Sequence, residues 1–513
     1  MRLAEHVPPD KPAVVLHPSG TVVTFADLDA RANRIAHLLR GHGVGPGDTV
    51  AILIDNNPHV HAVMWAARRS GCYYTLINSG LTAAEVAYIV ADCNARALFA
   101  SASVRQVCAE LPDHLPGGLP QLTVIAEAEL DGWLRYPDCV AGQPVSPVDC
   151  GEEGDLLQYS SGSTGRPKGI RRPRGGRRPA TGARGTTPVF ELVGVTEDSV
   201  YLSPAPLYHT APAMWTMCAQ SVGATTVVMQ RFDAEQALEC IQRYRVTHAQ
   251  FVPTMFVKML RLPENTRRAY DLSSLRRVVH ASAPCPPDIK REMIDWWGPI
   301  IDEYYSSSEG AGITFIRAEE WLTRPGSVGR PILGTPHILD EFGAELPPGE
   351  VGDIYFDGGY PFAYLNDEAK TRAARSPQGW VTVGDVGYLD EDGYLYLTDR
   401  RHHMIISGGV NIYPQEIENA LLSHPLVVDA AVFGVPDEVM GQSVKAVVQL
   451  TDPLLAEGER ADAMADELLT WLRARLARYK CPRSISFEDE LPRTDAGKLN
   501  KQPLIAKYSA ALR

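Results

Sequence analysis

A run of Gly, Ser and Thr residues that ends in Lys-Gly is the strongest chemical signal in the chain: Tyr159-Ser-Ser-Gly-Ser-Thr-Gly-Arg-Pro-Lys-Gly169. Small residues let main-chain amides approach a polyphosphate, hydroxyl groups add hydrogen-bond donors, and Lys168 adds a positive charge. The spacing is not that of a Walker A loop, G-x-x-x-x-G-K followed by Ser or Thr. Because the composition alone also fits a flexible Gly/Ser linker, the interpretation depends on the rest of the chain.

Four later segments carry side chains of the types that bind nucleotides and metal ions. They are Tyr305-Ser306-Ser307-Ser308-Glu309, Val383-Gly384-Asp385, Asp399-Arg400, and Pro492-Arg493-Thr494-Asp495-Ala496-Gly497-Lys498-Leu499-Asn500-Lys501. Taken singly, each is ordinary: an acid in a Ser-rich turn is usually solvated, and a lone Asp, Arg or Lys is usually a turn former, half of a salt bridge or a surface charge. Their joint occurrence in this order indicates a shared function.

With these motifs in this order, the sequence closely resembles the adenylate-forming superfamily of acyl-CoA synthetases, nonribosomal peptide adenylation domains and beetle luciferases. The resemblance covers nearly the whole chain and favours the acyl-CoA synthetase, or fatty-acid–CoA ligase, type. Three positions depart from the superfamily pattern: Ser306 and Ser308 replace Gly and Thr, and Val383 replaces Thr or Ser.

The resemblance implies an ATP-dependent acid–CoA ligase with ATP, Mg²⁺ and CoA as cofactors. A carboxylate attacks the α-phosphorus of ATP, pyrophosphate leaves, and the acyl group of the acyl-AMP then passes to a thiol. The first step gathers negative charge, so cations and amide donors stabilise it more than an acid–base pair would.

The resemblance also implies the residues that carry this chemistry. Lys498 would bridge the substrate carboxylate and the α-phosphate, Glu309 would hold Mg²⁺, Ser308 would donate its hydroxyl to the α-phosphate, and His209 would gate the acyl site. The implied ATP-binding residues are Ser160, Ser161, Gly162, Ser163, Thr164, Gly165, Lys168, Ala281, Ser282, Ala283, Tyr305, Asp385 and Arg400.

The second half-reaction requires a rearrangement, because Lys498 would hinder the thiol if it stayed in place. The resemblance implies rotation of the C-terminal domain about a hinge at Asp399 and His402, where relatives commonly have Lys or Asp in place of His402. The residues implied to line the CoA tunnel are Ser407, Gly408 and Gly409. A separate carrier protein with a phosphopantetheine thiol is the alternative acceptor, which would make the protein an acyl-AMP ligase.

The acyl site is expected to be apolar. Amino-acid adenylation domains place an Asp near the start of this motif to hold an ammonium group, but no Asp lies between Tyr208 and Phe232. The expected pocket residues are Trp215, Phe251 and Met255. An uncharged hydrophobic pocket fits a fatty, aryl or steroid-like carboxylic acid better than an amino acid.

Alternating helical and strand-like segments must position these residues. A capped amphipathic helix over Thr24–Leu39 precedes a buried strand at Thr49–Ile54, and the alternation predicts an α/β fold with largely parallel sheets. Later expected elements are a helix through His61–Ser70, a strand at 225–229, a helix at 234–244, a strand at 248–252 and a helix near 286–297.

From about Gly379 the pattern changes to period-two alternation around Asp392-Gly393, which indicates a hairpin. The part after Arg400 predicts an α+β unit with a helix at Pro414–Leu422, strands near 427–433 and 444–450, a helix near 461–478 and a strand at 484–488. We therefore expect a large N-terminal adenylation domain of layered α/β subdomains at 1–399 and a small mobile α+β domain at 400–513.

Composition narrows the class of protein further. The chain has 513 residues and a net charge of −13, which argues against a general nucleic-acid binder. The nine cysteines include no C-x-x-C pair, and neither a secretory signal nor a transmembrane segment is visible, so we expect a cytoplasmic location. The expected partners are a small carboxylic acid, ATP and CoA, and the sequence leaves a homodimer open.

One basic segment, 166–184, stands out against this acidic background. A nucleic-acid-binding role is disfavoured because no aromatic residues are interleaved for base stacking. Since the segment starts inside the Gly/Ser run, neutralising Arg171, Arg172 and Arg174 together is expected to raise the KM for ATP or CoA.

Overall fold

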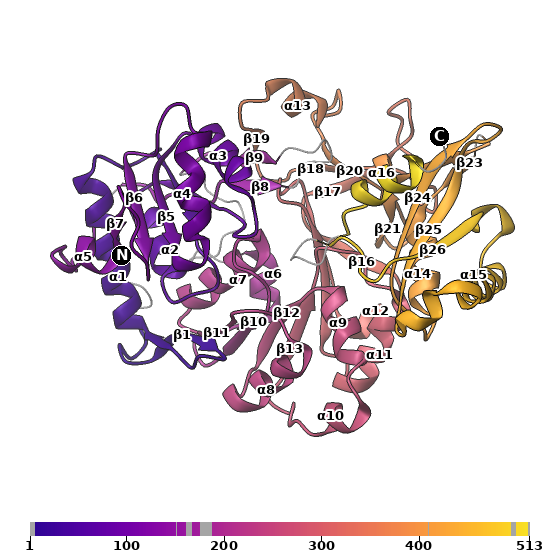
Figure 1. Ribbon diagram of the computed structural model, residues 1–513, viewed down its shortest axis with the longest axis horizontal. Coiled ribbons are helices and arrows are strands. Elements are labelled where there is room, and N and C mark those ends of the chain that lie inside the picture. Colours follow the sequence, from indigo (N-terminus) through magenta and orange to yellow (C-terminus); the bar gives the residue numbers. More distant parts are fainter. Residues whose placement is uncertain are drawn as a thin grey trace.

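The computed structural model describes residues 6–149, 151–160, 167–174, 187–408, 410–493 and 499–510. Figure 1 shows an indigo N-terminal layer and a yellow C-terminal unit on opposite sides of a pink central part. The predicted fold class, layered α/β subdomains with a smaller α+β unit at the C-terminal end, is confirmed. Within the described ranges, no helix combines the length and the apolar character that crossing a membrane requires.

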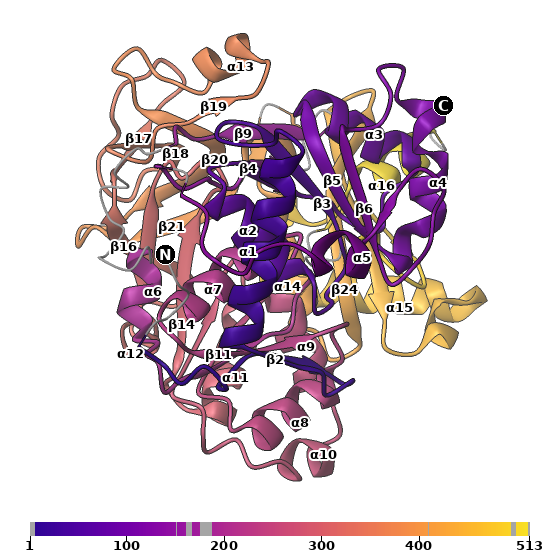
Figure 2. The same cartoon turned by 90° about the vertical axis from the view of Figure 1, so that its left-hand side faces the viewer.

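The N-terminal layer is a parallel sheet covered by helices on both faces (Figure 2). Successive residues of β3 face opposite sides: Val50 and Ile52 belong to one hydrophobic cluster, and Ala51 and Leu53 to the other. The fully apolar strand is therefore explained by burial on both faces. The strands, in spatial order, are β4 (Tyr73–Leu76), β3 (Thr49–Leu53), β5 (Ala95–Ser101), β6 (Leu122–Ala126) and β7 (Leu134–Arg135), and the helices are α1 (Phe25–Gly41), α2 (Val60–Arg69), α3 (Ala83–Asp92), α4 (Arg105–His114) and α5 (Tyr136–Ala141).

The central part contains a second parallel region, which belongs to a thirteen-stranded sheet. Its strands, in spatial order, are β14 (Ile301–Ser306), β13 (Arg277–His280), β12 (His248–Phe251), β10 (Val200–Ser203), β11 (Thr225–Met229) and β1 (Pro12–His17), with β2 (Val22–Thr24) antiparallel at the edge. The associated helices are α6 (Pro188–Val193), α7 (Thr210–Ser221), α8 (Ala234–Tyr244), α9 (Pro253–Leu260), α10 (Glu264–Arg268) and α11 (Pro287–Trp297). Ligands in such sheets bind beyond the carboxyl ends of the strands, where β13 and β14 lead into the predicted site segments.

The same sheet continues as antiparallel strands: β15 (Ile313–Ile316), β16 (Ser327–Leu333), β21 (Leu395–Arg400), β20 (Val381–Leu389), β18 (Gly352–Asp357) and β17 (Thr335–Leu339), with α12 (Ala318–Trp321) beside them. A separate three-stranded sheet joins β8 (Gln158–Ser160), β9 (Lys168–Arg171) and β19 (Ala363–Tyr364), followed by α13 (Glu368–Ala373) at the top of Figure 1. This small sheet brings the Gly/Ser run beside a segment about two hundred residues later.

The C-terminal unit has its own sheet and core. Its elements are β22 (Ile405–Ser407), β23 (Val410–Ile412), α14 (Pro414–Leu422), β24 (Val427–Asp437), β25 (Gly441–Leu450), α15 (Gly458–Arg473), β26 (Ser484–Phe487) and α16 (Gln502–Ala510). β21 ends in the thirteen-stranded sheet at Arg400 and β22 begins in the separate sheet at Ile405. Of the expected hinge residues, Asp399 belongs to the end of β21 and His402 lies between the two strands.

Most expected elements agree with the observed ones to within one or two residues. The Thr24 hydroxyl accepts a hydrogen bond of 3.1 Å from the amide of Asp27, as the helix cap predicted. The last long helix ends earlier than expected, at Arg473, because Ala477 is extended and Lys480 turns back to form an ion pair of 2.6 Å with Glu416 of α14.

Candidate active site

Glu309 lies in the turn after β14 and is almost completely buried, with 9% of its surface exposed. The phenol oxygen of Tyr364 in β19 donates a hydrogen bond of 2.8 Å to Oε1 of Glu309. Burial raises the pKa of Tyr364, and the Glu309 carboxylate raises it further, so the phenol keeps the proton it donates. A buried carboxylate needs such a donor, and this one fixes the orientation of the group expected to hold Mg²⁺.

The main chain of the same turn is held from the other side by Arg172, which follows β9. Its Nη2 donates a hydrogen bond of 2.8 Å to the carbonyl oxygen of Ser308, and its guanidinium lies 5.3 Å from the ring centre of Tyr360. Gly310 has a φ of +69°, and a Cβ there would come within 2.8 Å of both Arg172 and Tyr360. The turn therefore requires glycine at this position.

Three arginines of the basic segment, Arg171, Arg172 and Arg174, contact different parts of the chain. Arg174 Nη1 donates a hydrogen bond of 2.7 Å to the carbonyl oxygen of Gly71, and the exposed Arg171 lies over the ring of Tyr73 at 4.6 Å. Only Arg172 reaches the turn that carries Glu309. The expectation that the three act together on ATP or CoA stays a prediction. Their contacts show that each of the three side chains has a different environment.

The Gly/Ser run connects β8 to β9, and Ser160 pairs with Lys168 at the base of the hairpin. Burial lowers the pKa of Lys370 of α13, and Lys168 lies close enough for the two positive charges to repel each other, which lowers that pKa further. The implied phosphate-binding residues Ser161, Gly162, Ser163, Thr164 and Gly165 lie outside the described residues, as does Lys498.

Tyr305 and Asp385, which the resemblance assigned to ATP, lie in direct contact. The Tyr305 hydroxyl donates a hydrogen bond of 2.6 Å to Oδ2 of Asp385, which is 7% exposed. Asp385 pairs with Arg400 across β20 and β21, so the backbone brings together two residues expected at the ribose. The side chains of Ser160, Arg400 and His402 are outside the described part of the molecule.

The expected adenine segment, Ala281, Ser282 and Ala283, follows directly from β13. Ser282 has a φ of +75°, a conformation rare for residues with a side chain, and such strain concentrates at functional sites. Next to this segment the Glu303 carboxylate forms an ion pair with Lys290 at 2.7 Å, and Nε2 of His280 lies 3.3 Å from the same carboxylate oxygen.

Burial opposes ionisation of Glu303, but its two basic partners outweigh this effect and hold its pKa at about 2. The same burial lowers the pKa of His280. The Glu303–Lys290 ion pair therefore joins β14 to α11, and His280 at the end of β13 lies against the same carboxylate.

The expected acyl-pocket residues fall into two separate hydrophobic clusters. Trp215 of α7 packs with Phe190, Tyr201 and Tyr304, while Phe251 and Met255 belong to a cluster around β12, α9 and α11. Trp215 Nε1 donates a hydrogen bond of 3.2 Å to the Tyr304 hydroxyl. His209 stands at the N-cap of α7, 4.4 Å ring to ring from Tyr208.

Of these two clusters, only that of Trp215 contains a residue of the adenine segment, Ala281. Its partly buried members are Ala211, Met214, Ile332 and Leu333. The structure thus joins His209 and Trp215 to the expected nucleotide site through α7. It does not bring Phe251 and Met255 into the same cluster, and their place at an acyl pocket stays a prediction.

The expected hinge is tied to both parts of the chain. Asp399 accepts a hydrogen bond of 3.0 Å from the amide of Gln415 at the start of α14, and Arg401 forms an ion pair of 2.8 Å with Asp353 of β18. Arg261, just after α9, donates a hydrogen bond to the carbonyl oxygen of Val427 in β24.

Of the implied CoA residues, Ser407 ends β22 and Gly408 follows it, while Gly409 is outside the described ranges. Gly408 has a φ of +57° and donates its amide to the carbonyl oxygen of Met440 at 2.8 Å, and a Cβ there would clash with the Met440 side chain. A glycine is therefore needed at this bend.

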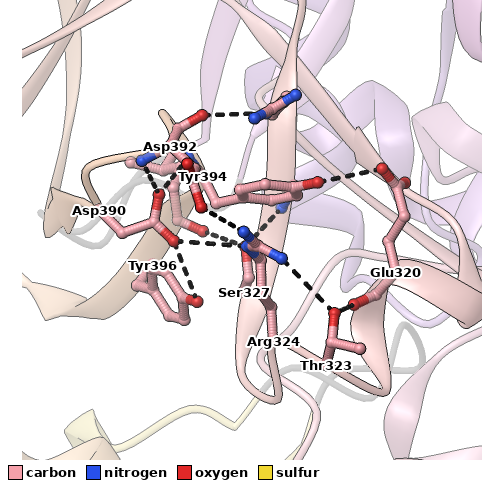
Figure 3. A network of polar contacts seen from close by, with 11 residues as sticks. Glu320, Thr323, Arg324, Ser327, Asp390, Asp392, Tyr394 and Tyr396 are labelled. Carbon is pink, nitrogen blue, oxygen red and sulfur yellow. Dashed lines mark hydrogen bonds and ion pairs between the residues drawn. The ribbon is translucent and has the colours of Figure 1, made fainter.

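A polar network holds the strand that leads to the hinge (Figure 3). Arg324 donates a hydrogen bond to Asp392 and lies 4.3 Å from the ring centre of Tyr394, whose hydroxyl donates a bond of 3.0 Å to Glu320. Ser327 in β16 donates a bond of 2.9 Å to the carbonyl oxygen of Leu395 in β21. The network attaches the hairpin of β20 and β21, and so Asp385, to the central sheet.

The large α/β body, the smaller α+β unit after Arg400 and the buried Glu309 held by β19 agree with the adenylating enzymes that the sequence resembles. The chain belongs to the AMP-binding enzyme family, whose family model matches residues 2–363, and the model of the AMP-binding enzyme C-terminal domain matches residues 416–498.

The proteins most informative about the type of AMP-binding enzyme are relatives named as CoA synthases or CoA ligases. The chain is 35% identical to a feruloyl-CoA synthase of an Amycolatopsis species over 95% of this chain and 94% of the relative. It is 33% identical to an indoleacetate–CoA ligase of Aromatoleum aromaticum over 93% of this chain and 92% of the relative. The structure of the anthranilate CoA ligase AuaEII with anthranoyl-AMP superposes with a TM-score of 0.84 at 26% identity, covering 99% and 96% of the two chains. The protein is an acyl-CoA synthetase that ligates an acid to CoA at the expense of ATP.

The sequence did not single out Tyr364 or Lys370, and it linked Arg172 to ATP or CoA without indicating its contact with the turn of Glu309. Tyr364 and Lys370 lie in or beside a short edge strand with no motif of their own, and Arg172 was assigned only to a charge run. Each contacts a predicted residue far away in the chain, so local pattern carried no signal for it.

Proposed function

We propose that the acid is aromatic, so that the protein is an aryl-acid–CoA ligase. The observation that carries this proposal is the aromatic cluster beside the adenine segment, in which Trp215 lies 5.3 Å from Phe190 and 5.9 Å from Tyr201, ring centre to ring centre. All three rings are buried, and a planar, apolar acid bound beside the adenine segment would pack against this cluster. The relatives named for ferulate, indoleacetate and anthranilate support the same class of acid.

The polar groups of this cluster belong to neutral side chains. Gln250 Nε2 and Trp215 Nε1 both donate to the Tyr304 hydroxyl, and burial raises the pKa of Tyr304 to about 12, so the phenol remains uncharged. A neutral, hydrogen-bonded wall can accept a polar ring substituent such as a hydroxyl or an amine. It offers no carboxylate for the ammonium group of an amino acid.

We propose that the chain's own residues carry the adenylation step as follows. Glu309, oriented by Tyr364, fits Mg²⁺, which would supply charge neutralisation of the phosphate oxygens when bound. Lys168 attracts the β- and γ-phosphates, the Ser308 hydroxyl donates to the α-phosphate, and Lys498 bridges that phosphate and the acid. Asp385, positioned by Tyr305, accepts hydrogen bonds from the ribose hydroxyls.

We propose that the thioester step uses a rotation of residues 400–513 relative to 1–399 about Asp399 and His402. The contacts of Arg401 with Asp353 and of Arg261 with Val427 cross between these two parts and would have to break in such a rotation. Ser407, Gly408 and Gly409 would then line the path of the CoA thiol. Because ATP and CoA are cytoplasmic metabolites, we propose the cytoplasm as the place of the reaction.

The experiment is a substrate panel with ATP, Mg²⁺ and free CoA. Aryl acids (ferulate, indoleacetate, anthranilate, cinnamate), fatty acids of several lengths and a steroid acid are compared by mass-spectrometric detection of the acyl-CoA. We expect the highest kcat/KM with an aryl acid. A preference for fatty acids, or transfer only to a phosphopantetheine carrier protein supplied in place of CoA, would contradict the proposal.

A further inference from the structure

Two lysine side chains meet beside the base of the Gly/Ser hairpin. Lys168 begins β9, and Lys370 lies in α13, just after the strand β19 that pairs with β9. The register places Tyr364 opposite Ile170, and the amide of Leu365 donates a hydrogen bond of 2.8 Å to the carbonyl oxygen of Gly169. The backbone thus holds α13 against the start of β9.

The side chain of Lys370 has a fixed place in this arrangement. Its Nζ lies 4.2 Å from the ring centre of Tyr364, the same tyrosine whose hydroxyl donates to Glu309. The strand that leads to Lys370 pairs with β9, so its ammonium group also lies near the charge of Lys168. Lys370 therefore stands between the residue expected to bind phosphate and the residue expected to bind Mg²⁺.

The acids around this pair are already engaged. Asp367 caps α13 by accepting a hydrogen bond of 2.9 Å from the amide of Lys370, and Glu309 accepts the Tyr364 hydroxyl. Both carboxylates attract Lys370 electrostatically, but burial and the neighbouring Lys168 outweigh them and lower the pKa of Lys370 to about 8. Two ammonium groups held in contact repel each other, and an anion placed between them would relieve that repulsion.

We propose that Lys370 is a second phosphate-binding residue, which acts with Lys168 to hold the β- and γ-phosphates of ATP and the pyrophosphate product. The inference rests on the proposed use of ATP in adenylation and adds a residue that no motif of the chain marks. A polyphosphate offers several anionic oxygens, so two lysines can each make a charge-assisted hydrogen bond to it. The cation–π contact with Tyr364 restricts where the Lys370 ammonium group can lie.

The test compares Lys370→Met with Arg372→Gln. Methionine keeps most of the stem that packs over Tyr364 and removes the charge. Arg372 lies on the same helix, is exposed, and pairs only with Glu368 among the ion pairs of the described residues, at 3.6 Å, so its substitution is a matched loss of one charge. Lys370→Arg keeps the charge and serves as the rescue variant.

Two quantities are measured: the affinity of inorganic pyrophosphate with Mg²⁺ by titration calorimetry, and the KM values for ATP and acid in ATP–pyrophosphate exchange. We expect Lys370→Met to weaken pyrophosphate binding and to raise the KM for ATP about tenfold or more, the value of one charge-assisted hydrogen bond, with the KM for the acid unchanged. Arg372→Gln should stay within about twofold of wild type, and Lys370→Arg should recover most of the affinity.

Two outcomes would overturn the proposed phosphate-binding role of Lys370. One is an unchanged pyrophosphate affinity in a Lys370→Met variant that thermal melting shows to be folded. The other is a wild-type protein that binds no pyrophosphate. If the wild type forms thioesters while Lys370→Met binds pyrophosphate normally, the inference fails and the proposed function stands. If pyrophosphate binding depends on Lys370 but no acid is adenylated, the proposed function fails and the binding role stands.

Discussion

The guanidinium of Arg172 donates a hydrogen bond of 2.8 Å to the main-chain oxygen of Ser308, 136 residues further along the chain. On the other side of the same turn, Tyr364 donates to the Glu309 side chain. Arg172 follows β9 and Tyr364 belongs to β19, its partner strand, so one small sheet holds both the backbone and the carboxylate of the acidic turn. The strand β9, which follows the Gly/Ser run, and the acid expected to hold Mg²⁺ are therefore positioned by the same small sheet.

From this relationship we expect Arg172→Gln to slow adenylation. Loss of a hydrogen bond from a charged donor costs about 1.5–3 kcal/mol, which corresponds to a fall of roughly ten- to a hundredfold in kcat/KM if the turn is needed in place. The measurement is ATP–pyrophosphate exchange with a saturating acid. We expect the loss mainly in kcat, since Arg172 positions the turn rather than contacting ATP.

The chain offers two matched controls for this prediction. Arg171→Gln removes an adjacent exposed charge, and Arg174→Gln removes a hydrogen bond to the carbonyl oxygen of Gly71, away from the acidic turn. Both should keep near-normal exchange rates. Equal losses in all three variants would mean that the basic segment acts through its overall charge.

Tyr364→Phe should change the response to Mg²⁺. The substitution keeps the ring under Lys370 and removes only the hydroxyl that orients Glu309. We expect the Mg²⁺ concentration for half-maximal exchange to rise several-fold. Loss of the group that orients a metal ligand typically lowers metal affinity about ten- to a hundredfold. The effect should be smaller here because the phosphate oxygens of ATP also bind the ion. Tyr396→Phe removes a comparable hydroxyl near Asp390, and its Mg²⁺ dependence should match wild type.

The buried ion pair next to the adenine segment should appear as a stability effect. Glu303→Gln leaves the Lys290 ammonium, which is fully buried, without its counter-charge, and removing one partner of a buried pair costs about 3–5 kcal/mol of unfolding free energy. The measurement is denaturant unfolding at neutral pH. Replacing both partners with apolar residues, as in Lys290→Met with Glu303→Leu, should recover part of the loss, and a double variant no better than Glu303→Gln would contradict this account.

The same carboxylate makes stability depend on pH. The pKa of Glu303 is about 2 in the folded chain and near 4.5 in its ordinary state, so its ion pairs stabilise the fold fully above about pH 4.5. As pH falls towards 2, the unfolded state takes up the proton first and this contribution is lost. The slope of unfolding free energy against pH in that range should be smaller in Glu303→Gln than in wild type.

Much of this fold and site could be predicted from the sequence, because helix caps, apolar runs and short motifs depend on neighbouring residues. The Thr24 cap and the apolar run of β3 are set by neighbouring residues, and the Gly/Ser run and Glu309 lie in motifs of short span. The family resemblance assigns both Tyr305 and Asp385 to ATP, and the structure adds that their side chains are in contact.

What the sequence could not supply is which distant side chains meet. Arg172 reads as part of a charged loop and Lys370 as a surface lysine, because the contacts that define them come from the pairing of β9 with β19. Apolar composition likewise cannot tell which face of a sheet a residue covers, so Trp215 and Phe251 were expected together although they pack in different clusters.

The most direct test of the account is the stoichiometry of one reaction: the preferred aryl acid with ATP, Mg²⁺ and free CoA, with nucleotides and thioester quantified together. The account predicts that each aryl-CoA formed is accompanied by one AMP and one pyrophosphate, and that acyl-AMP accumulates when CoA is withheld. Formation of ADP in place of AMP, or the absence of any thioester with free CoA, would contradict it.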